Sequence, residues 1–183
     1  MYNIALKLAV ILNHALDNKY PLNKLRYGIE LIITQSILLI SMTIFSVLSG
    51  TLVELFCFLI PLVLIRTFSG GFHSKTFSEC FIITNSVCFT SIYLSETIDN
   101  NLFYTLISIS SYIIICLCSP ITSKKMSIEK IKFNKLYAIL FSSFFTLFVL
   151  FNNVLKLKLI NIFSYVLFAV AISLLVSLRS EIK

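Results

Sequence analysis

A histidine, a cysteine, an arginine and a glycine pair lie close together in the middle of this chain. A thiol is a weak nucleophile at neutral pH because its ordinary pKa is about 8.5, and a nearby imidazole that accepts its proton creates the reactive thiolate. The group therefore indicates nucleophilic thiol chemistry. Its members are Arg66, Gly70, Gly71, His73 and Cys80.

The spacing between His73 and Cys80 sets a condition on the structure around them. On a straight helix, residues seven apart share a face but are separated by about 10.5 Å along the axis, too far for a hydrogen bond. We therefore predict that residues 70–76 are not helical, a break that Gly70 and Gly71 permit at little steric cost. The N–H groups of the two glycines are candidates to stabilise an oxyanion, and simple turn formation is an equally good explanation of the pair.

Long apolar runs surround this group and identify the class of protein. Of the 183 residues, 58% are hydrophobic and only 13% are charged, which indicates an integral membrane protein. The runs leave no room for a separate globular domain, so we expect one all-α membrane bundle over residues 1–183. The six predicted spans are 28–49, 51–65, 80–97, 102–119, 136–154 and 159–178.

Residues 1–20 precede the first span and show a different pattern. Apolar residues at helical spacing occupy one face and polar residues the other, which is typical of an amphipathic helix lying in the membrane interface. The apolar face contains Ile4, Leu8, Ile11, Leu12 and Ala15.

The positive residues predict the orientation in the membrane. With six spans and both termini cytoplasmic, all 15 Lys and Arg residues except Lys156 and Lys158 lie in cytoplasmic segments. The predicted site then faces the cytoplasm. The basic stretch 124–135 has two interpretations, contact with anionic lipid headgroups or a landing surface for an acidic partner. Nothing in the sequence resembles a nucleic-acid-binding motif.

Glu30 and Arg66 are predicted at similar depth, near the cytoplasmic ends of the first and second spans. They can form an ion pair that holds the helices together, or Arg66 can bind a substrate carboxylate or a developing oxyanion; both roles stay open. The other four cysteines are interpreted as small apolar residues. The chain has only two histidines, so no metal site and no cofactor is expected.

The quoted residues resemble a known family. The segment Tyr27-Gly28-Ile29-Glu30, the run from Arg66 to His73 and Cys80 are similar to the accessory gene regulator protein B (AgrB) family of bacterial quorum-sensing systems. The resemblance implies a multi-pass cysteine endopeptidase of the bacterial cell membrane that processes a short AgrD-like propeptide into a cyclic thiolactone or lactone. It also implies that His73 and Cys80 are the catalytic pair and that Glu30, Arg66 and Gly71 support the site.

The chain departs from the family pattern in one loop. After Pro120 the family often has a second proline beside a lysine, whereas here Lys124 and Lys125 follow without it. Either lysine is a candidate for the substrate-binding position. The competing function is a small membrane transporter or scaffold in which Arg66, Glu30 and His73 form a polar clamp. Whether the protein forms a homodimer stays open.

Overall fold

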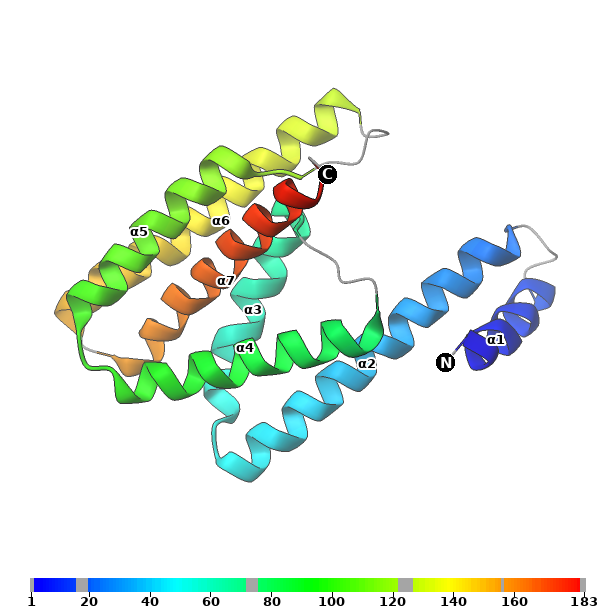
Figure 1. Ribbon diagram of the computed structural model, residues 1–183, viewed down its shortest axis with the longest axis horizontal. Coiled ribbons are helices and arrows are strands. Elements are labelled where there is room, and N and C mark those ends of the chain that lie inside the picture. The colour runs from blue at the N-terminus through cyan, green and yellow to red at the C-terminus, as the bar shows by residue number, and fades with distance from the viewer. Residues whose placement is uncertain (1, 16–19, 72–75, 122–126, 156, 182–183) are drawn as a thin grey trace. The chain divides into compact units, whose positions relative to one another are not determined.

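The computed structural model describes residues 2–15, 20–71, 76–121, 127–155 and 157–181. Within them the chain forms seven α-helices and no strand (Figure 1), which confirms the predicted all-α fold. The helices are α1 (Tyr2–Ala15), α2 (Leu22–Ser49), α3 (Leu52–Ser69), α4 (Phe77–Thr97), α5 (Asn101–Cys118), α6 (Ile128–Leu155) and α7 (Lys158–Glu181).

Five of these helices, α2, α3, α5, α6 and α7, are long and apolar enough to cross a membrane. Their outward surfaces expose large apolar side chains, such as Leu48 (81% exposed) and Leu117 (77%), whereas serines such as Ser108, Ser111 and Ser142 are fully buried. A water-soluble protein shows the reverse pattern, and small polar residues between helices are typical of packing in lipid. The chain is a multi-pass membrane protein.

Helix α4 differs from the predicted span at 80–97. It has 21 residues, enough to cross the hydrocarbon core, but it is not among the five sufficiently apolar helices. Polar side chains occur along its whole length, and several of them line a pocket described below. The six predicted spans therefore correspond to five apolar helices and one more polar helix.

Helices α2 and α6 begin well before the predicted spans, and α4 begins at Phe77 instead of residue 80. Helix α2 starts at Leu22 instead of residue 28, and α6 starts at Ile128 instead of residue 136. The first turns of both are polar, and lysine and glutamate are good helix formers that a search for apolar runs does not detect. Part of the basic stretch 124–135 is therefore helical, whereas 122–126 lie outside the described residues.

The chain divides into two compact units, Met1–Leu48 and Ser49–Lys183, and the expectation of a single domain stays a prediction. In the first unit, Ala5 and Ala9 of α1 are fully buried, whereas Ile4 and Ile11 are more than half exposed. An exposed apolar face is what an interfacial helix needs. The membrane contact of α1 also stays a prediction.

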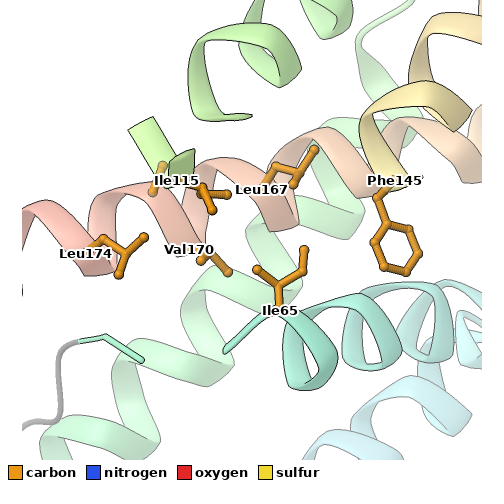
Figure 2. Packing of buried hydrophobic residues seen from close by; sticks show 7 residues of the cluster. Ile65, Ile115, Phe145, Leu167, Val170 and Leu174 are labelled. Carbon is orange, nitrogen blue, oxygen red and sulfur yellow. The ribbon is translucent and has the colours of Figure 1, made fainter. Parts of the chain in front are cut away.

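The second unit holds α3 to α7 around the most buried helix, α7, which packs against the other four. Its main core lies between α3, α5, α6 and α7, where Figure 2 shows the side chains of Ile65, Ile115, Leu167 and Val170 gathered together. Packing of this kind fixes the relative positions of α3 and α7, the helices that carry part of the candidate site.

Successive helices in this unit run in opposite directions between its two ends. At one end, the Ile121 N–H donates to the Ser69 carbonyl oxygen (3.0 Å), which joins the segment after α5 to the end of α3. At the other, the Tyr104 hydroxyl donates to the carbonyl oxygens of Leu94 (3.2 Å) and Ile98 (2.8 Å) and ties α4 to α5. We call the end with Ser69 the motif end, because the glycine pair and Arg66 lie there.

Candidate functional site

The glycine pair ends α3 and redirects the chain. Gly70 has φ +74° and its N–H donates to the Arg66 carbonyl oxygen (3.0 Å), and Gly71 has φ +143°. Residues with side chains rarely adopt such angles. The predicted break is confirmed for Gly70, Gly71 and Thr76, none of which is helical, whereas 72–75 lie outside the described residues. Because the Gly70 N–H is engaged at the helix end, the Gly71 N–H is the remaining glycine candidate for an oxyanion.

Cys80 lies in the first turn of α4, a position that favours negative charge. Thr76 caps this helix, since its hydroxyl oxygen accepts from the Glu79 N–H (3.3 Å), and the Cys80 N–H donates to the Thr76 carbonyl oxygen (3.3 Å). The sequence Thr-x-x-Glu at 76–79 is a typical N-terminal capping pattern. At such a position the helix dipole interacts favourably with a nearby negative charge.

A pocket of about 530 Å³ brings Cys80 and Arg66 to one place. It lies between α3, α4 and α7 and is lined mostly by apolar side chains such as Leu62, Val87 and Phe168. On α4 the lining extends from Cys80 to Leu94, about 20 Å at the helical rise, so the pocket is a groove that descends from the motif end. Polar α4 residues that distinguish this helix from the apolar spans, including Thr84, Thr90 and Ser91, line it.

Two other segments hold the glycine turn in place. A Cβ placed on Gly70 would lie 3.0 Å from the Ile121 carbonyl oxygen, and one placed on Gly71 would overlap Ser173 Oγ of α7 and lie 4.0 Å from Arg66 Nε. The sequence did not indicate that Ile121 or Ser173 is a neighbour of the glycine turn. A serine in an apolar helix is ordinary, and only the tertiary packing shows that this one touches the turn.

The model of the family described as Accessory gene regulator B matches residues 2–176. This chain belongs to the accessory gene regulator B family. No curated protein and no solved structure matches it. The protein is thus a multi-pass accessory gene regulator of a quorum-sensing system, and the match runs from α1 almost to the end of α7.

Within this accessory gene regulator B protein, the predicted site residues have different outcomes. Arg66 and Cys80 line one pocket, and Gly70 and Gly71 form the turn that follows Arg66. Glu30 is half-buried on α2 in the first unit, so its ion pair with Arg66 stays a prediction. His73, Lys124 and Lys125 lie outside the described residues.

The motif end carries an aromatic cluster that joins α3 to α6. Phe68 stacks on Tyr137 (ring centroids 5.1 Å apart) and on Phe141 (5.6 Å), and Phe133 adds an edge contact. These contacts fix the first turns of α6, with their exposed Lys130, Lys132 and Lys135, beside the end of α3. Part of the predicted basic surface is therefore held near the site.

We expect Phe68→Ala to destabilise the protein by about 1–3 kcal/mol, because two stacked aromatic pairs are lost at about 0.5–1.5 kcal/mol each. Unfolding by denaturing detergent measures this change. Phe56→Ala is the matched control, since Phe56 lies on the same helix and is 52% exposed. An equal effect of the two substitutions would show that the cluster contributes nothing beyond apolar area.

The two ends of the second unit differ in charge. The motif end carries Arg66, the three lysines at the start of α6 and Arg179 in the last turn of α7. At the opposite end, a second pocket of about 350 Å³ is lined by Glu54, Glu96 and Lys158. Glu79 and Glu129 also lie at the motif end, but positive residues outnumber acidic ones there.

Proposed function

We propose that this protein is a membrane-embedded cysteine endopeptidase that cleaves an AgrD-like propeptide and releases part of it as a cyclic thiolactone or lactone. The observation that carries the proposal is the placement of Cys80, at the start of α4 and in one pocket with Arg66. Family membership supports the substrate, since accessory gene regulator B proteins act with such a propeptide.

The first chemical step is transfer of the peptide to the enzyme. The Cys80 sulfur attacks the carbonyl carbon of the scissile bond and forms a C–S bond. The C–N bond then breaks, and His73, which holds the former thiol proton, delivers it to the leaving amine. The Gly71 N–H and the Arg66 guanidinium are the candidates to stabilise the oxyanion between these events.

The second step releases the product as a ring. A thiol or hydroxyl within the retained peptide attacks the thioester carbonyl, its proton passes to His73, and the Cys80 thiolate leaves. When the attacking group is a thiol, one thioester replaces another, so little bond energy is lost. Cyclisation succeeds only if water does not reach the thioester first, and the apolar lining of the groove supports that exclusion.

The charge distribution supports a cytoplasmic site. Lys and Arg near span ends are retained on the cytoplasmic side. In the described part of the second unit, all of them except Lys158 lie at the motif end, whereas Glu54, Glu96 and Asp99 lie towards the other. With the motif end in the cytoplasm, a newly made propeptide reaches Cys80 from the side on which it is synthesised. An acidic segment in the propeptide would meet the lysines of α6, and Lys124 and Lys125 would extend that surface.

Trapping the covalent intermediate tests the proposal. The purified protein in liposomes is given an AgrD-like propeptide, with the ring-forming cysteine or serine of the peptide replaced by alanine. We expect a peptide adduct on Cys80 by mass spectrometry, because the second step is blocked, and no adduct with Cys80→Ala. Cleavage by Cys80→Ala, or peptide transport without cleavage, would instead favour the transporter or scaffold function.

A further inference from the structure

A serine of α7 stands at the point where the glycine turn, the arginine and the pocket meet. Ser173 lines the same pocket as Arg66 and Cys80. Its Oγ occupies the position that a Cβ on Gly71 would need, and this position is 4.0 Å from Arg66 Nε. The serine hydroxyl therefore packs directly on the backbone of the turn.

We propose that Ser173 is a positioning residue for the site. Gly71 is only two residues before His73 in the sequence, so the contact with Ser173 fixes the last described residue before the histidine. The proposal rests on the proposed cysteine endopeptidase function and adds α7 to its active site.

The packing of α7 explains why this contact can hold the turn. Neighbouring residues on both sides of Ser173, Val170 and Leu174, are 1% and 0% exposed and belong to the main core. A helix fixed in this way keeps the serine hydroxyl at a constant position. A shift of about 1 Å in a catalytic group can cost about a hundredfold in rate, so a rigid support for the turn has a measurable effect.

The contact also predicts how Gly71 and Ser173 interact as a pair. Alanine at Gly71 overlaps Ser173 Oγ and is strained by the φ of +143°. When Ser173 is also alanine, the nearest remaining atom of that side chain is its Cβ at 3.6 Å, an ordinary van der Waals contact. The second substitution removes the overlap and leaves only the backbone strain.

The experiment measures kcat and KM for propeptide cleavage by full-length protein in liposomes. We expect Ser173→Ala to lower kcat about tenfold and to leave KM within about twofold, because the hydroxyl positions the site without binding substrate. We expect Gly71→Ala to lower kcat about a hundredfold and the double variant to be several times more active than Gly71→Ala. The substitution at Ser173 is thus harmful alone and beneficial when it is combined with Gly71→Ala.

Ser142→Ala is the matched control, a fully buried serine of α6 whose hydroxyl donates to the Ile139 carbonyl oxygen of its own helix. Equal activity of Ser173→Ala and this control, or a double variant no better than Gly71→Ala, would overturn the proposal. If Ser173→Ala lowers the yield of folded protein, the double variant still decides the test. A loss of stability would not make the double variant more active than Gly71→Ala. Propeptide cleavage by Cys80→Ala would reject the proposed function itself. If Cys80→Ala is inactive but Ser173→Ala is fully active, only the role of Ser173 is rejected.

Discussion

Replacing Cys80 by alanine is expected to lower the rate of propeptide cleavage by at least about a thousandfold, the largest effect of any substitution in the described site. The reason is that no neighbouring group can replace the nucleophile: Arg66 is a cation, and the hydroxyls of Thr84 and Ser173 are much weaker nucleophiles than a thiolate. A thousandfold loss corresponds to about 4 kcal/mol of transition-state stabilisation. Single-turnover cleavage of the labelled propeptide measures it.

Two other cysteines provide controls for this prediction. Cys88 lies two turns further along α4 and is fully buried, and Cys57 lies half-buried on α3. Neither lines the pocket, so alanine at either position should leave cleavage within about twofold at matched protein levels. If Cys88→Ala or Cys57→Ala matched the loss in Cys80→Ala, helix packing would explain the result better than nucleophilic catalysis.

The local features of the site were predictable because each depends on a few neighbouring residues. Glycines at 70 and 71 predict the end of a helix, and the structure confirms it through the φ angles of +74° and +143°. The spacing from Arg66 to Cys80 indicated a shared site, and the two residues line one pocket. The turn depends on local geometry alone, whereas the shared pocket also needs α7 beside α3 and α4.

The remaining features depend on packing between distant segments. Nothing in the sequence near Ser173 marks it as a neighbour of Gly71, because the contact exists only when α7 lies beside α3. The polar character of α4 has the same origin, since its threonines and serines line a groove instead of facing lipid. In a search for apolar runs, such residues only lower the mean hydropathy of the span.

The start of α6 was predicted wrongly for a different reason. The apolar run predicted a start at residue 136, whereas the helix begins at Ile128 and includes three lysines. Hydropathy measures only the length within the hydrocarbon core, and a helix continues beyond it wherever its residues have good helix propensity. Phe68 then determines where this polar extension lies, through its stacking on Tyr137.

Replacing His73 by alanine is expected to lower cleavage by about a hundredfold to ten-thousandfold, the range that general acid–base catalysis contributes. Without the imidazole, the thiol of Cys80 loses its proton acceptor, and the leaving amine loses its proton donor. Both losses act on the chemical step, so kcat should fall while KM changes little. Free imidazole added to the assay should restore part of the rate in His73→Ala, because it can carry the proton in place of the missing side chain.

The second histidine of the chain gives the matched control. His14 lies exposed in the last turn of α1, and His14→Ala should cleave at the wild-type rate and show no response to imidazole. A large loss of cleavage rate that imidazole partly restores, seen for His73→Ala but not for His14→Ala, indicates proton transfer. Added imidazole cannot replace a structural role. A His73→Ala variant with unchanged kcat would contradict the thiolate–imidazolium mechanism.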